Sequence, residues 1–259
     1  MVGLEGVEGE AGVEGLTHAE LRSRRAAALR GGDRCAAAAL AALLAARERR
    51  QHTGEMLDIF DDSLRPAGVK ERGLVHLEGD WHRSFHCWLV SPARVSLILQ
   101  RRAATKATYP GALDASVAGH YRSGEGVAQG CRECEEELGL RLDPALLVPL
   151  GRAVSAARHG FLIDREVADV FLYASDVTPE ALRPDPAEVA EVLEAPLVPL
   201  GALFRGEVAD APAVAHGVGL PARAVRVRIQ EFTVHLDRYY PRLAFHALRL
   251  ARGLPPLCL

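Results

Sequence analysis

The stretch that decides the fold reads Arg132-Glu133-Cys134-Glu135-Glu136-Glu137-Leu138-Gly139-Leu140. At the pitch of an α-helix, four of its five charged side chains project within an arc of about 140°; these are Arg132, Glu133, Glu136 and Glu137. Apolar positions fall on the opposite side at Val127, Cys131, Cys134 and Leu138. Gly139 follows the last of them, where a C-terminal cap is expected. The sequence therefore predicts an amphipathic helix with one packed face and one charged face.

Three carboxylates on adjacent helical turns repel one another, and a divalent cation relieves that repulsion. The ordinary interpretation is a solvated acidic surface, because most charged side chains are solvated. Here, however, the arginine and the terminal glycine occur together with Gly119 and Glu125 upstream. This combination favours a functional face that holds Mg²⁺, with Mn²⁺ as an alternative ion.

The glycine, the glutamate and the helix together resemble the signature of the Nudix hydrolases, in which GxxxxxE is followed by RE-apolar-xEExG-apolar. Six residues, 126–131, separate Glu125 from Arg132, one fewer than in the family. This deletion leaves the spacing from Arg132 to Glu137 intact but shifts Glu125. In the family this glutamate braces the loop, so the deletion affects that role of Glu125.

What the resemblance implies is an enzyme that attacks a diphosphate linkage with water and uses Mg²⁺. By analogy, Glu133, Glu136 and Glu137 bind the metal, directly or through water, together with the backbone carbonyl of Ala118. Arg132 orients Glu133, which is also a candidate general base. The fold that the family implies is an α/β/α sandwich with a mixed sheet.

A second resemblance surrounds the signature, through residues 101–111 and 116–120. These segments are similar to the isopentenyl-diphosphate-isomerase-like branch of the Nudix proteins. In that branch, cations at the positions of Arg102 and Lys106 contact the substrate diphosphate, a role that suits long basic side chains. The competing interpretation for both residues is ordinary solvated charge.

The same branch implies a histidine-rich metal site. This chain offers His82, His120 and Glu166 for it, with His76 and Asp164 as less secure alignments. Histidine and carboxylate ligands together suit a transition metal. Ordinary surface or hydrogen-bonded histidines are the competing interpretation, since the chain has ten histidines.

Two departures separate the chain from the true isomerases. Their proton-donating cysteine falls on Ala118, and alanine has no proton to give. They also often lack the full set of signature carboxylates, which this chain keeps. The leading hypothesis is therefore Mg²⁺-dependent hydrolysis of a nucleoside diphosphate derivative or a small organic diphosphate. Isomerisation of isopentenyl diphosphate is the alternative, and a non-catalytic binding module with the same fold is a third.

Composition limits the partners and the compartment. With 31 basic and 34 acidic residues the net charge is −3, so no basic field indicates a nucleic-acid polymer, whereas a small phosphorylated substrate needs only a local pocket. The five cysteines form no disulfide-like framework, which indicates a reducing, cytoplasmic setting. Cys131 and Cys134 are expected to pack in the core rather than bind zinc. No run of about 18 apolar residues is present, so no membrane span is expected.

We expect three regions in the 259 residues. Residues 1–53 form an extension, unstructured at 1–16 and helical at 35–49, that suits a docking helix or a homodimer contact; an extension without function is an equally good account. Residues 54–210 form the Nudix-like domain. Residues 211–259 are expected to fold as two helices, 222–238 and 242–252, packed on the domain.

Within the domain, short apolar segments between turn residues predict strands. Residues 57–60 and 66–68 flank Asp61-Asp62-Ser63 as a first hairpin, and residues 84–90 and 95–99 flank Ser91-Pro92-Ala93 as a second. Further short elements are expected at 147–150, 167–173, 188–193 and 197–200.

Overall fold

The computed structural model describes residues 18–40, 43, 54–159, 162–217, 219–235 and 238–254. Two pieces of the N-terminal extension are helical, α1 (His18–Arg30) and residues 34–40. The expected unstructured segment 1–16 lies outside the described residues, as does most of the expected helix 35–49 beyond residue 40. None of the described helices is long and apolar enough to cross a membrane.

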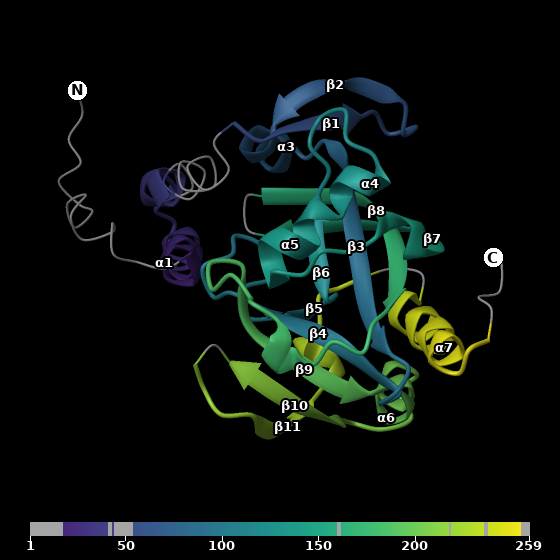
Figure 1. Cartoon of the computed structure of the whole chain (residues 1–259). Helices are drawn as coiled ribbons and strands as arrows, with labels where there is room; N and C mark the ends of the chain where they lie inside the picture. Colours follow the sequence, from purple (N-terminus) through teal and green to yellow (C-terminus); the bar gives the residue numbers. More distant parts are fainter. Residues whose placement is uncertain are drawn as a thin grey trace.

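Eleven strands of the described chain join in one sheet (Figure 1). Its main path runs β11 (Arg223–Val227), β10 (Ala211–Gly217), β9 (Val189–Pro196), β4 (Ser96–Arg102), β3 (Trp81–Ser91), β1 (Met56–Phe60) and β2 (Pro66–Glu71). Off this path, β5 (Leu113–Asp114) pairs with β4, β6 (Val117–His120) pairs with β3, and β7 (Val148–His159) pairs with β8 (Leu162–Ala174). β3 and β8 run parallel, whereas their other neighbours run antiparallel. The expected mixed sheet is confirmed.

Both expected hairpins are present. β1 and β2 pair across the turn at residues 61–65, and β3 meets β4 at Val90 and Leu97. Beyond that point the two strands diverge, so that β4 pairs with β9 while β3 pairs with β6 and β8. Residues 84–87 of β3 therefore lie between β6 and β8. This arrangement brings side chains from three strands to one end of the sheet.

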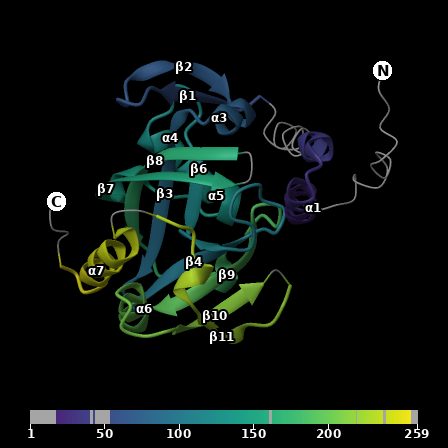
Figure 2. The ribbon, with the colours of Figure 1, turned by 180° about the vertical axis from the view of Figure 1, so that it is seen from behind.

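Helices cover both faces of the sheet, which confirms the expected α/β/α sandwich (Figures 1 and 2). Because side chains alternate across a strand, Leu89 and Ile98 enter one core while Trp88 and Leu97 enter the other. The first core is shared with α5 (Arg132–Leu138), and the second with α6 (Leu197–Phe204) and α7 (Tyr239–Ala251). Two further short helices are α3 (Arg72–Glu78) and α4 (Val127–Gly130). Single turns of 3-10 helix lie at Pro144–Leu146, Pro179–Ala181 and Ile229–Glu231.

The expectation of two helices in residues 211–259 is wrong for the first of them. Residues 211–217 and 223–227 are strands that extend the main sheet beyond β9, so position 210 is not a boundary between strands and helices. The reason is the alternation of valine with arginine over residues 225–228, which buries Val227 and leaves Arg226 exposed. The second helix is present as α7, which begins at Tyr239 and holds Pro241 in its first turn, where a missing N–H costs no hydrogen bond.

Candidate active site

The charged face predicted for residues 132–137 is present on α5. Cys134 and Leu138 are fully buried beneath it, while Gly139 ends the helix in the left-handed conformation at φ 65°. The three carboxylates differ in exposure: Glu133 and Glu137 are 8% and 4% exposed, whereas the side chain of Glu136 is 50% exposed. Two of the acids are therefore largely removed from water, a costly arrangement for carboxylates without a compensating charge.

Arg132 is the centre of an ion-pair network. Its guanidinium donates to both carboxylate oxygens of Glu125, at 2.9 and 3.0 Å. It also donates to Glu133 at 2.6 Å, to Glu136 at 2.8 Å and to the carbonyl of His120 at 2.8 Å. Burial alone lowers the pKa of this guanidinium, but the hydrogen bond with Glu125 and the surrounding carboxylates raise it overall. The arginine therefore stays charged and holds two elements of the motif together.

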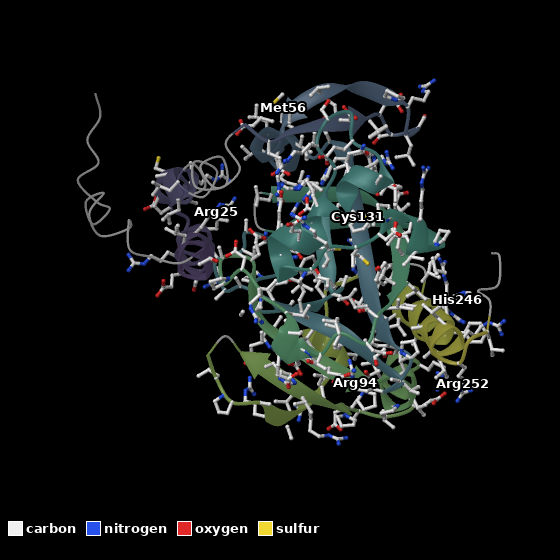
Figure 3. All side chains as sticks on the ribbon, viewed as in Figure 1. Arg25, Met56, Arg94, Cys131, His246 and Arg252 are labelled. Carbon is white, nitrogen blue, oxygen red and sulfur yellow. The ribbon has the colours of Figure 1, made fainter. Side chains whose placement is uncertain are left out.

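The shortened spacer does not separate Glu125 from the helix. The segment after Glu125 forms α4, and Cys131, which is labelled in Figure 3, lies between α4 and α5. Cys131 itself is buried against the core. With this shorter spacer, two hydrogen bonds join Glu125 and Arg132.

Glu133 and Glu137 lie against the backbone of β6. The amide of Ala118 donates to Glu137 at 3.3 Å, and Gln100 donates to the same oxygen at 3.2 Å. Burial, reinforced by the neighbouring carboxylates, raises the pKa of Glu133 to about 7 and that of Glu137 well above its ordinary value. Buried carboxylate oxygens are suitable ligands for a divalent cation. A bound cation would also stabilise the ionised form of these carboxylates, which burial alone disfavours.

These carboxylates line a groove of about 1340 Å³, part of it open solvent, which we call the carboxylate groove. Its other charged residues include Arg72, Lys106, Arg122, Asp185 and Glu188. Sequence reasoning found Lys106 but missed Arg72, Asp185 and Glu188. Arg72 is the first residue of α3, and the backbone amide of Asp185 donates to the carbonyl of Glu137 at 2.9 Å. Neither position carries a motif that could have identified it.

The two cations expected to contact a diphosphate differ in their access to the carboxylate groove. Lys106 reaches the carboxylate groove and is ion-paired with Glu188. Burial, together with the charge of Arg102, lowers the pKa of Lys106. Arg102 does not line the groove; it donates to Asp114 at 3.1 Å and to the carbonyl of Thr108. Arg102 and Lys106 instead share a second, smaller space, because both line it.

The histidine-rich set is brought together at the end of the sheet. His76, His82 and His120 offer ring nitrogens within 4.8 Å of one another, and His82 does the same with Asp164 and Glu166. These residues come from α3, β3, β6 and β8. His120 lies 3.2 Å from Glu166, and His82 lies 3.7 Å from Asp164.

The chemistry of this cluster fits a transition metal. Burial lowers the pKa of His82 to about 4 and holds that of His120 well below its ordinary value, so both imidazoles are neutral and able to ligate. Within the described residues, the buried atoms His82 Nε2, His120 Nδ1 and Asp164 Oδ1 make no hydrogen bond. Buried polar atoms without partners call for an explanation such as an ion.

A second, smaller pocket is also lined by residues of β6. It encloses about 550 Å³, part of it open solvent, and we call it the inner pocket; its polar lining includes Ser84, His86, Asp114, Glu166, Thr233 and His235. The carboxylate groove and the inner pocket share five residues, which are Arg72, Lys106, Ala118, Gly119 and His120. Two cations and the β6 backbone therefore stand where the two spaces meet.

The sequence is similar to a known family and to several known proteins. The model of the NUDIX domain matches residues 80–216, more than half of the chain. An uncharacterised Nudix hydrolase of Clostridium acetobutylicum is 42% identical over 123 residues, covering 47% of this chain and 60% of the relative. The isopentenyl-diphosphate Delta-isomerase of Klebsiella pneumoniae is 33% identical over 141 residues, covering 53% of this chain and 74% of the relative.

The chain therefore belongs to the Nudix family, and its relatives include proteins named as hydrolases and as isopentenyl-diphosphate isomerases. It spans 60% of the length of the Clostridium relative and 16% of Nudix hydrolase 3 of Arabidopsis thaliana. Among solved structures, DR0079 of Deinococcus radiodurans is 24% identical with a TM-score of 0.45, covering 59% of this chain and 90% of that chain.

Proposed function

We propose that the protein hydrolyses a diphosphate linkage in a nucleoside diphosphate derivative or a small organic diphosphate, with Mg²⁺ as its cofactor. The observation that carries the proposal is the convergence of Glu133, Glu136 and Glu137 on a groove that also contains Arg72 and Lys106. Oxygen ligands for a cation and basic groups for phosphate oxygens face the same space. Membership in the Nudix family supports the same chemistry.

The three glutamates, with the backbone carbonyl of Ala118, would hold the ion. Bound Mg²⁺ neutralises charge on the phosphates and lowers the pKa of a bound water. Arg132 fixes the Glu133 carboxylate through its 2.6 Å contact. Glu133 is also the candidate general base, because an ionised carboxylate that lines the groove can accept a proton from the attacking water.

Arg72 and Lys106 would bind the diphosphate where the two spaces meet. Each is ion-paired in the structure, Arg72 with Glu55 and Lys106 with Glu188. A diphosphate has more charge than either carboxylate and would compete for the cations. Arg102, held by Asp114, would contact the substrate from the inner pocket rather than from the groove.

We also propose that His82, His120 and Glu166, with His76 and Asp164, hold a second metal ion of the transition series. The converging ring nitrogens and the buried atoms without hydrogen bonds support this site. After dialysis against Mn²⁺ or Zn²⁺, elemental analysis should find one equivalent fewer in His82→Ala than in the unmodified protein. Equal metal content in both proteins would contradict the second site.

Isomerisation of isopentenyl diphosphate is a second candidate, which the histidine cluster and the Klebsiella relative favour. The half-buried Ala118 stands against it, because this position has no proton to transfer. We expect no dimethylallyl diphosphate from isopentenyl diphosphate with Mg²⁺ or Mn²⁺. Its formation would replace the hydrolase assignment.

A screen of nucleotide sugars, dinucleotides, nucleoside di- and triphosphates, and isoprenoid and thiamine diphosphates tests the proposed reaction. With Mg²⁺, at least one class should release a phosphorylated product, and EDTA should abolish the release. Tight diphosphate binding without turnover across a metal panel would instead indicate a non-catalytic binding module.

A further inference from the structure

The inner pocket contains a histidine whose proton position is determined by its neighbours. His86 Nδ1 lies 3.0 Å from the hydroxyl of Tyr239, and that hydroxyl accepts a hydrogen bond from Trp88 Nε1 at 2.9 Å. The indole can only donate, so the proton of the Tyr239 hydroxyl is left for His86 Nδ1. His86 therefore carries its own proton on Nε2. This N–H lies 4.0 Å from Glu166, too far for a hydrogen bond, and remains available as a donor.

A second histidine in the pocket, His235, offers a hydrogen-bond acceptor where His86 offers a donor. Thr233 Oγ1 lies 3.1 Å from the Asp114 carboxylate, which can only accept, and 2.8 Å from the Tyr240 hydroxyl, whose own proton is donated to the Thr233 carbonyl. The threonine proton is taken up by these two contacts, so toward His235 Nε2, 3.2 Å away, the same oxygen accepts. Burial and the neighbouring His86 lower the pKa of His235 to about 4, so its ring is neutral at pH 7. With the proton on Nε2, His235 Nδ1 is an acceptor, and within the described residues it makes no hydrogen bond.

The two rings are in edge-to-face contact, with centroids 5.5 Å apart, and both residues line the inner pocket. The pocket wall therefore presents one donor, His86 Nε2–H, and one acceptor, His235 Nδ1, at neighbouring positions. A hydroxyl group, which both donates and accepts, satisfies such a pair. A hydrocarbon would leave both atoms unpaired after displacing their water, at a cost of about 1–3 kcal/mol for each polar group.

We propose that the inner pocket holds the organic group of the substrate and selects a hydroxyl-bearing group, as in a sugar diphosphate, over an isoprenoid. This inference rests on the proposed function, because the cations shared by the two spaces place the diphosphate next to the pocket. His86 and His235 are then the residues that determine specificity.

A matched pair of ligands tests the proposal. Ribose 5-diphosphate and isopentenyl diphosphate are both five-carbon diphosphates that differ in their hydroxyl groups. Their methylenediphosphonate analogues, which cannot be hydrolysed at the bridge, are titrated by calorimetry into the unmodified protein with Mg²⁺. The ribose compound should bind at least about tenfold more tightly, as expected for one well-formed hydrogen bond. Equal binding, tighter binding of the isopentenyl compound, or binding of neither would overturn the proposal.

Substitutions in the inner pocket show which residue produces the preference for the ribose compound. His235→Leu removes the acceptor and should bring the ratio of the two dissociation constants close to one, whereas His235→Asn keeps a polar group and should retain part of the preference. His216→Leu, on β10 and paired with Glu180, is the matched control and should leave the ratio unchanged. An unchanged ratio in folded His235→Leu would contradict the assignment. Because binding of the analogues requires no turnover, failure of the hydrolase proposal would appear separately, as absence of phosphate release from every diphosphate tested.

Discussion

Gly119 and Glu133 are packed so closely that a β-carbon on Gly119 would fall 2.2 Å from the carboxyl carbon of Glu133. The backbone of Gly119 does not adopt a positive φ, so the requirement for glycine here is one of space. The signature glycine therefore acts on the signature glutamate directly, by letting its carboxylate lie against β6.

Gly119→Ala should impair catalysis while leaving the stability of the fold nearly unchanged. The atoms that would clash belong to the end of a flexible side chain, so Glu133 can rotate away and the free energy of unfolding should change by less than about 1 kcal/mol. The displaced carboxylate should lower kcat/KM by about tenfold or more. Gly126→Ala is the control, since the nearest atom to its added carbon lies at 3.5 Å. If both alanine variants kept full activity, the close packing would have no role in the site.

Loss of the Glu125–Arg132 pair should destabilise the protein. Glu125→Ala leaves a half-buried guanidinium without its bidentate partner, and we expect a loss of about 2 kcal/mol in urea unfolding. Glu135→Gln breaks the exposed pair with Arg141 and should cost less than about 0.5 kcal/mol. Equal losses in the two variants would mean that the shortened spacer has removed the bracing role of Glu125.

His235 should make stability depend on pH in a defined window. Because burial lowers its pKa in the folded protein to about 4, the unfolded chain binds a proton more readily between about pH 4 and the ordinary value of 6.5. The stabilising contribution is therefore present above pH 6.5 and is lost as the pH falls, by up to about 3 kcal/mol. Urea unfolding of the unmodified protein and of His235→Asn should diverge across this range. Parallel pH profiles would show that His235 is not neutral in the folded state.

Local spacing was sufficient to predict α5 and its carboxylates, because the faces of a helix follow from its period. It was insufficient for residues 223–228, where arginines allow both a helix and an exposed strand edge, and pairing with β10 decides in favour of the strand. Local sequence patterns also could not predict which residues meet in the inner pocket. His86 and Tyr239 are 153 residues apart in the chain, and only the stacking of α7 on the sheet joins them.

Arg72 illustrates the same limit at the carboxylate groove. It begins a short helix with no recognisable motif, and it reaches the groove because β1 and β2 position α3 beside β8. The histidine cluster, in contrast, was assembled from the resemblance alone. Four of its five members meet because β6 and β8 flank β3, and the fifth, His76, is brought in by α3, which packs on β8. Spacing along the chain contains neither relationship.

The most direct test of the central claim compares two neighbouring glutamates on α5. Glu136 and Glu135 have similar side-chain exposure, 50% and 48%, and each is ion-paired with an arginine, but only Glu136 lines the carboxylate groove. Product release with Mg²⁺ is measured for Glu136→Gln and Glu135→Gln on the best diphosphate found. The metal-site account predicts a loss of about a hundredfold or more for Glu136→Gln and near-normal turnover for Glu135→Gln, with both proteins folded. Unchanged turnover in Glu136→Gln would contradict it.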